Sequence, residues 1–273
     1  MAEQFDAKRY LVKPGQKVNL KDWDPGERRL SSGDKAVDAQ TLATLNERLD
    51  KLQDLLFAVH KHKLLLVLQG MDTSGKDGTI RSVFNSVDPL GVRVANFKAP
   101  TEDELDRDFL WRVHKQVPGK GEIVIFNRSH YEDVLIVPVH GWITPEECER
   151  RYKEINEFER LLSDSDTIFI KCFLYISKNE QKARLEERLA NPRKRWKFRL
   201  GDLAERKLWK KYIQAYESAL AATSARSAPW YVVPADSKTE RNLIVSSLLM
   251  QTLENLKMQY PEPEDDLSGV VVE

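Results

Sequence analysis

The chain of 273 residues is long enough for one large α/β domain or for two small domains. Its 43 basic and 43 acidic residues balance, so the overall charge points neither to an anionic nor to a cationic partner. Because no apolar run is long enough to cross a bilayer and the first residues lack the apolar core of a signal peptide, we expect no membrane partner. The two isolated cysteines, Cys148 and Cys172, fit a reducing cytoplasm better than a disulfide framework, so we expect a cytoplasmic protein.

The N-terminal part of the chain predicts an arm followed by a long helix. Residues 1–34 are polar and are interrupted by several Pro-Gly and Ser-Gly turns, which predicts an irregular arm. From Asp38 to Lys61, leucines recur at alternating steps of three and four, which predicts a helix with one apolar stripe. The stripe spans fewer than three heptads, so we expect it to pack on the core; a contact between subunits is the alternative.

A buried strand and a phosphate-binding loop come next. Leu64–Leu68 are all apolar, as in a strand buried on both faces. The following Gly70–Lys76 match GxxxxGK, the loop that joins a strand to a helix and holds phosphate with its N–H groups and its lysine. We therefore predict that phosphate or nucleotide is bound by Gly70, Thr73, Ser74, Gly75, Lys76, Asp77, Gly78 and Thr79.

The loop departs from the usual pattern in one position. The Ser or Thr that holds Mg²⁺ after the lysine is here Asp77, and the nearest hydroxyl downstream is that of Thr79. Asp72 within the loop can supply an oxygen ligand to a hard cation instead. The alternative is a glycine-rich turn that only resembles the loop. The strand before it and the helix pattern behind it argue against that alternative.

The remaining elements alternate between strands and helices. Strands are predicted at 92–97, 122–126, 167–176 and 230–233. Helices are predicted at 101–114, 144–162, from 177 onward, at 202–222, and from 237 to a point before Pro261. This alternation predicts right-handed crossovers and a mostly parallel sheet, with ligands at the carboxyl ends of the strands. One domain at 35–259 is the simplest division, followed by a flexible acidic tail at 260–273.

A second motif, Asn127–Asp133, follows the strand at 122–126. Many P-loop enzymes end this strand with an aspartate that steadies Mg²⁺, whereas the residue here is the uncharged Asn127. Arg128 beside it would direct a planar fork of donors at phosphate oxygens. The alternative is that Arg128 and Asp133 form an ordinary surface ion pair.

A third motif is rich in cations. Arg184 and Arg188 lie four residues apart, on one helix face, and the segment Arg193–Arg199 holds five cations interleaved with two aromatic residues. A solvated basic face is the ordinary meaning of such a run. Its density, and the helices on both sides, instead favour a hinged lid at about 181–211 that contacts a long polyanion.

These motifs together resemble the polyphosphate kinase 2 family, from about Lys35 to Met258. The segments that carry the resemblance are GMDTSGKDG, FNRSHYEDVL, RLANPRKRWKF, WKKYIQAYESAL and APWYVVPAD. The resemblance implies an α/β, three-layer P-loop kinase fold with a mostly parallel central sheet and a helical lid. It also implies reversible phosphoryl transfer between inorganic polyphosphate and a nucleotide, dependent on Mg²⁺ with Mn²⁺ as a substitute, in a homo-oligomer, either a dimer or a tetramer.

The resemblance also assigns roles to residues. The family's catalytic phosphate and metal positions fall on Asp72, Lys76, Arg128 and Arg188, and we expect Asp133 to share the metal with Asp72. Asn127, with Glu132 nearby, resembles the class that accepts both nucleoside mono- and diphosphates, namely AMP and ADP, with GMP and GDP as further candidates. The polymer is expected to contact Arg184, Arg193, Lys194, Lys197 and Arg199.

Two other functions fit parts of the pattern. An ATP-dependent kinase of nucleotides or small molecules would need a base pocket for a second nucleotide, and the spacing identifies none. A non-catalytic polyanion-binding protein would bind nucleic acid as readily as polyphosphate. Such a protein has no use for Asp72, Lys76 and Arg128 together, so we expect an enzyme with no nucleic-acid partner.

Overall fold

The computed structural model describes residues 5–263, 265, 268, 270 and 272. In this part of the chain a six-stranded sheet has the order β1-β6-β5-β2-β4-β3. All neighbouring strands pair in parallel except β1, which is antiparallel to β6. The predicted α/β fold with a mostly parallel sheet is confirmed. The strands are β1 (Leu11–Val12), β2 (Lys63–Gln69), β3 (Val92–Asn96), β4 (Ile123–Asn127), β5 (Thr167–Tyr175) and β6 (Trp230–Pro234).

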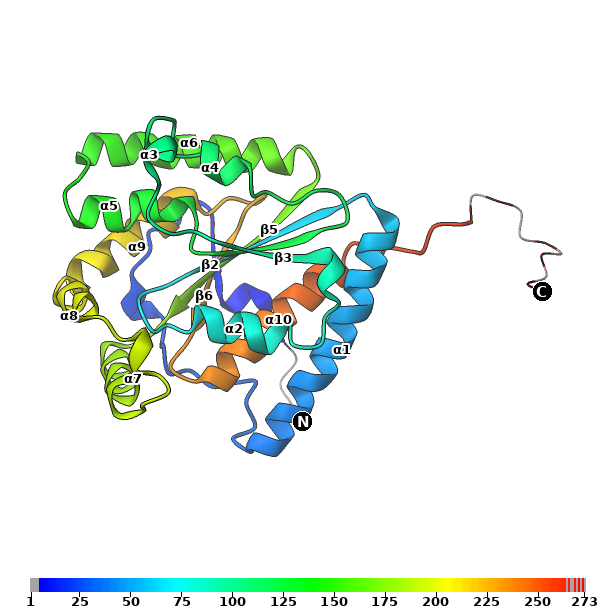
Figure 1. Cartoon of the computed structure of the whole chain (residues 1–273), viewed down its shortest axis with the longest axis horizontal. Coiled ribbons are helices and arrows are strands. Elements are labelled where there is room, and N and C mark those ends of the chain that lie inside the picture. Colours follow the sequence, from blue (N-terminus) through cyan, green and yellow to red (C-terminus); the bar gives the residue numbers. More distant parts are fainter. Residues whose placement is uncertain (1–4, 264, 266–267, 269, 271, 273) are drawn as a thin grey trace.

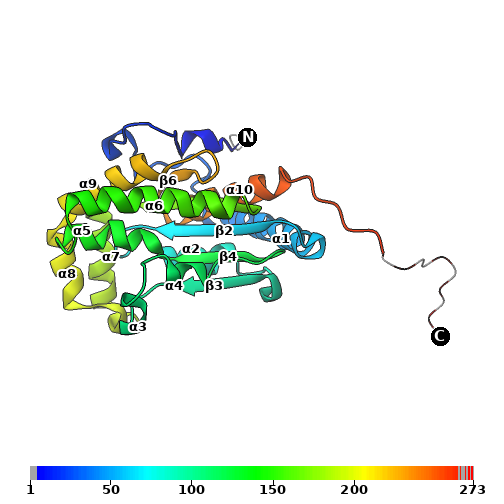
Figure 2. The same ribbon diagram turned by 90° about the horizontal axis from the view of Figure 1, so that it is seen from above.

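Helices cover both faces of the sheet, giving three layers (Figures 1 and 2). One face carries α1, α2 and α10, and the other carries α5, α6 and α9. The helices are α1 (Lys35–Val59), α2 (Lys76–Val83), α3 (Glu102–Leu105), α4 (Trp111–His114), α5 (Ile136–Val139), α6 (Pro145–Ser163), α7 (Lys178–Ala190), α8 (Leu200–Lys207), α9 (Trp209–Thr223) and α10 (Lys238–Glu254). Short 3-10 helices are η1 (Ala7–Arg9), η2 (Leu20–Asp22), η3 (Pro89–Gly91), η4 (His130–Val134) and η5 (Arg195–Lys197). No helix among the described residues is both long enough and apolar enough to span a bilayer.

The central position of β2 places the phosphate loop at the middle of one sheet edge. β2 lies between β4 and β5, and Leu64–Leu68 are fully buried. Leu68 is level with Asn127 of β4, and Gln69 is level with Phe173 of β5. The carboxyl ends of these strands therefore meet, and in open α/β sheets this is the edge where ligands bind.

Local signals set the helix starts. Thr101 and Glu104 form a reciprocal capping box, and Thr144 accepts a hydrogen bond from the N–H of Glu147, with Pro145 in the first turn. The predicted stripe of α1 packs as expected: α1 lies against α10, and Leu49 and Leu56 are fully buried.

Two predicted helices are wrong because each is broken. The helix predicted at 101–114 is α3 and α4, separated where the Asp108 carboxylate accepts the Leu110 N–H in a turn. The helix predicted at 202–222 is α8 and α9. They are separated at Leu208, whose N–H donates to the Glu205 carbonyl oxygen three residues earlier, at 3.0 Å. This spacing is that of a 3-10 turn and not of an α-helix.

The N-terminal arm is more ordered than predicted. Leu11 and Val12 add the edge strand β1 to β6, and Tyr10, Val12 and Leu20 are buried in the core. A strand of two residues is too short to leave a periodic signal in the sequence. Of the predicted tail at 260–273, residues 260–263 form neither helix nor strand, and positions 264, 266–267, 269, 271 and 273 lie outside the described residues.

Candidate active site

The loop between β2 and α2 is wound tightly and requires glycine. Gly70 and Gly75 have φ of 156° and 107°, in the region that favours glycine. A Cβ on Gly70 would lie 2.6 Å from Ser74 Oγ and 2.8 Å from the Leu174 carbonyl oxygen, so no side chain fits there. Thr73 also has a positive φ, 65°, which a threonine adopts only when its surroundings hold it. The loop therefore has the curled shape that phosphate binding needs.

Hydroxyl groups in and behind the loop have no hydrogen-bond partner among the described residues. Thr73, Ser74 and Thr79 are buried, and none of their hydroxyls makes a hydrogen bond within the described part of the chain. A buried hydroxyl left unpaired costs about 1–3 kcal/mol, so such groups mark places where a ligand or water completes the structure. Asp77 and Gly78 lie exposed on the first turn of α2.

Lys76 folds back over the loop. Its Nζ donates to the Gly70 carbonyl oxygen at 2.6 Å. Burial and the nearby Arg128 lower the pKa of Lys76 to about 8, although Asp72 and Glu132 act in the opposite direction. A bound phosphate beside Nζ would favour the charged ammonium, so binding and protonation of this lysine are coupled.

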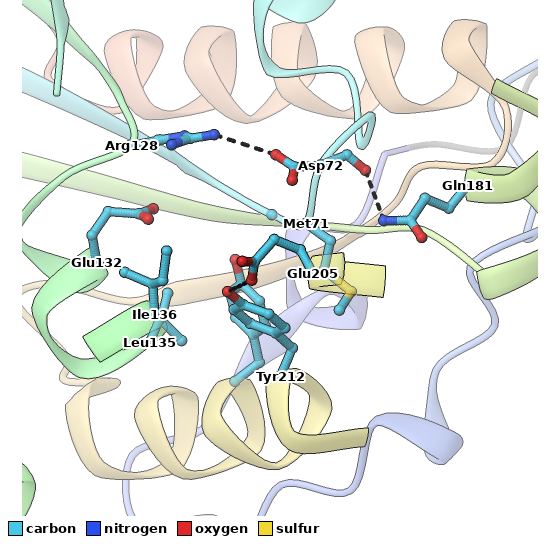
Figure 3. Close-up of a pocket in the computed structure, with 11 residues that line it drawn as sticks. Met71, Asp72, Arg128, Glu132, Leu135, Ile136, Gln181, Glu205 and Tyr212 are labelled. Atoms are coloured by element: carbon cyan, nitrogen blue, oxygen red, sulfur yellow. Dashed lines mark hydrogen bonds and ion pairs between the residues drawn. The ribbon is translucent and has the colours of Figure 1, made fainter. Parts of the chain in front are cut away.

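A cavity of about 190 Å³ adjoins the loop (Figure 3). Asp72, Arg128 and Glu132 line it, and the Arg128 guanidinium lies 3.3 Å from the Asp72 carboxylate. The structure thus brings three predicted site residues together, although Arg128 has a left-handed backbone with φ of 63°. The full lining is Gly70, Met71, Asp72, Arg128, Glu132, Leu135, Ile136, Gln181, Glu205, Tyr212 and Tyr216.

The apolar wall of this cavity was not predicted. Leu135 and Ile136 lie at the start of α5, and Tyr212 comes from α9 (Figure 3). Tyr216 also comes from α9. The Tyr212 hydroxyl donates to Glu205 Oε2 at 2.5 Å. The two tyrosines are four residues apart, which places them on one helix face, and this spacing was the available signal. The dense run of cations just before the two tyrosines obscures this signal in the sequence.

Glu132 lies between cations at the back of the cavity. Burial raises its pKa above the ordinary range, although Arg128 and Lys76 pull it down. With the Gln69 amide oriented so that both its ends are satisfied, its nitrogen donates to Glu132 Oε1 at 3.0 Å and its oxygen accepts from the Ser129 N–H. The carboxylate is therefore held in place from β2.

The two residues that depart from the usual P-loop pattern, Asp77 and Asn127, contact each other. Its Nδ2 donates to Asp77 Oδ1 at 2.9 Å and to Asn96 Oδ1 at 2.8 Å. The aspartate that replaces the usual Ser or Thr is thus hydrogen-bonded to the asparagine that replaces the usual aspartate. A carboxylate is therefore still present beside the end of β4, but α2 contributes it instead of β4.

Asp133, which we expected to share the metal with Asp72, lines a different cavity from Asp72. It lines a second cavity of about 290 Å³, where Arg151 Nη1 lies 3.5 Å from its carboxylate. Burial raises the pKa of Asp133 to about 6, against the effect of Arg151 and Arg112. Glu132 and Asp133 are adjacent in the 3-10 turn η4, but their side chains line different cavities. The alternative of an Arg128–Asp133 surface pair is also wrong, since Arg128 pairs with Asp72.

We expect Asp133→Asn to leave the rate of phosphoryl transfer within about twofold of the wild-type rate, because this carboxylate lies outside the main cavity. Asp72→Asn should lower the rate by about tenfold or more, since it removes a charged ligand from the loop. Steady-state rates at several Mg²⁺ concentrations check both variants. Equal losses in the two would show that Asp133 acts at the metal after all.

Arg184 is placed differently from the prediction. Its guanidinium is buried and donates to the carbonyl oxygens of Thr73 and Ser74 at 2.8 and 3.1 Å. It also donates to the carbonyl oxygens of Ala235 and Asp236 at 2.6 and 2.8 Å. Both Nη groups are therefore committed to backbone carbonyls, while Nε donates to the Glu180 carboxylate at 2.8 Å. Arg184 thus supports the loop instead of facing a polymer. The sequence spacing identified the helix face but not which of its arginines points inward.

The other cations of this segment lie outside the lining of the cavity. Arg188 Nη1 is 3.7 Å from Asp202 Oδ2, and Lys194 pairs with Glu187 at 2.5 Å. Lys197 lies over the Trp196 ring, 5.1 Å from its centroid. Figure 2 shows α7 and α8, which flank these residues, at the end of the molecule toward which the β2 arrow points. Arg193 and Arg199 are exposed.

Acidic side chains do not cluster as in a protein-only metal site. Among the residues that the structure describes, no group of three or more His, Cys, Asp or Glu side chains could hold a metal ion. Mg²⁺ commonly keeps several waters and binds through one or two carboxylates together with substrate phosphates. Asp72, which lies within the phosphate loop, fits this mode of binding.

Comparisons with known proteins agree with this geometry. The family model for Polyphosphate kinase 2 (PPK2) matches residues 32–261. The AMP/ADP-polyphosphate phosphotransferase of Meiothermus ruber is 55% identical over 97% of this chain and 100% of its own length. The ADP-polyphosphate phosphotransferase of Rhodopseudomonas palustris is 43% identical over 95% of this chain and 93% of its own.

A solved structure shares both the fold and the sequence motifs. The crystal structure of Polyphosphate Kinase 2 from Arthrobacter aurescens TC1 matches with a TM-score of 0.92 and 44% identity, covering 96% of this chain and 93% of that chain. The resemblance seen in the sequence is therefore confirmed. The phosphate loop, the arginine after β4 and these matches show that the chain is a phosphotransferase that belongs to the polyphosphate kinase 2 family.

Proposed function

We propose that this enzyme transfers phosphoryl groups reversibly between inorganic polyphosphate and nucleoside mono- and diphosphates, with AMP and ADP as acceptors and GMP and GDP as further candidates. The names of the Meiothermus ruber and Rhodopseudomonas palustris relatives support AMP and ADP. The observation that carries the proposal is the cavity that joins the phosphate loop to an apolar wall containing Tyr212 and Tyr216. A nucleotide needs both an anion site and a flat apolar surface for its base.

The loop and its cations would position the reacting phosphates. Lys76 and the loop N–H groups would hold the phosphate at the point of transfer, and Arg128 and Arg188 would stabilise the charge on the transferring group. The acceptor oxygen belongs to a phosphate and is already ionised, so no strong general base is needed. The contribution of the protein is therefore positioning and charge neutralisation.

Asp72 would hold Mg²⁺, with Mn²⁺ as a substitute, as the metal's principal protein ligand. The ion would supply neutralisation of phosphate charge when bound. Glu132 lines the same cavity, and burial raises its pKa. Because a carboxyl group with a raised pKa is more readily protonated, it suits contact with the anionic phosphate of the acceptor. Asn127 and Glu132 together resemble the class of the family that accepts both nucleoside mono- and diphosphates, and this resemblance supports both kinds of acceptor.

The segment at about 181–211 would act as a lid over the loop. Arg193, Lys194, Lys197 and Arg199 would contact the polymer, whereas Arg184 is excluded from this set because its donors are committed. Closure would exchange the contact between Arg188 and Asp202 for a contact with phosphate. We also propose that the protein is cytoplasmic and forms a homo-oligomer, either a dimer or a tetramer. Light scattering measures the number of subunits.

One assay tests the proposed function. AMP and ADP are each incubated with long-chain polyphosphate and Mg²⁺, and the products are separated by chromatography. We expect ADP and ATP from AMP, ATP from ADP, and a rate that depends on polyphosphate chain length. Transfer from ATP alone would indicate an ATP-dependent kinase, and binding of nucleic acid without any transfer would indicate a polyanion-binding protein.

A further inference from the structure

A buried arginine touches the phosphate loop from the side of α10. Arg241 is only 2% exposed, and its Nη1 donates to the Ser74 carbonyl oxygen at 3.1 Å. A Cβ on Gly75 would lie 1.9 Å from Nη1, and a Cβ on Gly78 would lie 3.4 Å from Nη2. The guanidinium therefore occupies the space beside both glycines, and their lack of side chains allows α10 to approach the loop this closely.

The charge of Arg241 has no counter-ion in the part of the chain that the structure describes. Among the described residues no carboxylate lies within ion-pair distance of its guanidinium; Nε and Nη2 donate instead to the neutral Asn242 Oδ1, at 3.2 and 2.9 Å. Burial, and the neighbouring Arg184, lower its pKa to about 9. Arg184 differs in this respect, because its Nε lies 2.8 Å from the Glu180 carboxylate.

A buried charge without a partner is unfavourable, and proteins normally pair such groups or neutralise them. Here the unpaired charge lies directly against the loop that binds an anion. The peptide between Ser74 and Gly75 is planar and trans, so the Ser74 carbonyl, which accepts from both Arg241 and Arg184, directs the Gly75 N–H away from α10. Low polarity around the guanidinium also lets its charge act over a longer distance than it would in water.

We propose that Arg241 is a positioning residue for phosphate, and that the anion bound in the loop is the missing counter-ion of its buried charge. This inference rests on the proposed function. Arg241 acts through the Ser74–Gly75 peptide and through its electric field, without contact with the ligand. The free enzyme therefore carries an unfavourable buried charge that condensed phosphate compensates on binding.

The test compares Arg241→Gln and Arg241→Lys by calorimetric titration with phosphate, pyrophosphate and tripolyphosphate, without nucleotide or metal. Arg241→Gln should weaken tripolyphosphate binding by about tenfold, and the loss should grow from phosphate to tripolyphosphate. Arg241→Lys should restore most of the affinity at pH 7. The matched control is Arg48→Gln, which removes the same charge from an exposed residue that pairs with Glu254 at the other end of α10.

If Arg241 had a purely structural role, Arg241→Gln would lower the melting temperature of the free protein but leave tripolyphosphate affinity unchanged. This result would overturn the inference about Arg241 but not the proposed function. If Arg241→Gln does not fold, Arg241→Lys is titrated at rising pH beside the wild type. A buried lysine loses its charge at lower pH than arginine, so its affinity should fall first; parallel curves overturn the inference. A wild-type protein that binds no condensed phosphate overturns both the inference and the proposed function.

Discussion

Replacing Lys76 with methionine is expected to reduce the rate of polyphosphate-dependent phosphoryl transfer by about 10²-fold or more, as loss of an electrostatic donor does at other active sites. Lys76 Nζ lies over the loop, 2.6 Å from the Gly70 carbonyl oxygen. Methionine keeps most of the side-chain volume, so the loss reports on charge and hydrogen bonding. Initial rates with ADP and long-chain polyphosphate measure it.

Lys63→Met is the matched control for this variant. Lys63 lies at the opposite end of β2, where its Nζ donates to the Ser165 carbonyl oxygen at the surface. Its replacement should leave the rate close to that of the wild type. Nearly normal turnover by Lys76→Met would remove the phosphate loop from the mechanism and, with it, the role proposed here for Asp72.

Replacing Lys171 with methionine is expected to lower the free energy of unfolding by about 3–5 kcal/mol. Lys171 is fully buried, with its Nζ 2.6 Å from Glu159 Oε2 and 2.8 Å from both the Tyr131 hydroxyl and the Thr223 carbonyl oxygen. Burial acts to raise the pKa of Glu159, but Lys171 and His130 lower it, so this carboxylate stays charged. Methionine would leave that buried charge without its main partner.

A double replacement separates the loss of the ion pair from the loss of packing. Lys171→Met with Glu159→Leu removes both charges, and we expect it to recover most of the lost stability, since apolar residues often replace buried ion pairs at little cost. Equilibrium denaturation by urea measures all variants. If the double variant were as unstable as the single one, the network around Tyr131 would be contributing through its hydrogen bonds instead.

The features that the sequence predicted correctly depend on short segments. Leu64–Leu68 predict a buried strand because all five are apolar, and Thr101 with Glu104 predicts a helix start because the partners are three residues apart. The glycines of the loop likewise determine only their own backbone conformation, which is curled at Gly70 and Gly75. In these cases the cause and the structure lie within a few residues of each other.

The features that it did not predict depend on how distant segments meet. Arg184 and Arg188 are indistinguishable by spacing, and only the contact of α7 with the loop after β2 decides that Arg184 is the one that supports the loop. Glu132 and Asp133 are adjacent, yet η4 sends them to separate cavities. Arg241 showed no local signal, because its importance comes from the close approach of α10 to Gly75.

The pairing of β1 with β6 has a consequence for the handling of this protein. Leu11 and Val12 occupy the outer side of β6 opposite Tyr231 and Trp230. If the first dozen residues were deleted, β6 would become an open edge with unsatisfied N–H and C=O groups, which is a template for intermolecular β-pairing and aggregation. By pairing with β6, the N-terminal arm therefore covers this edge of the sheet and opposes β-pairing between molecules there.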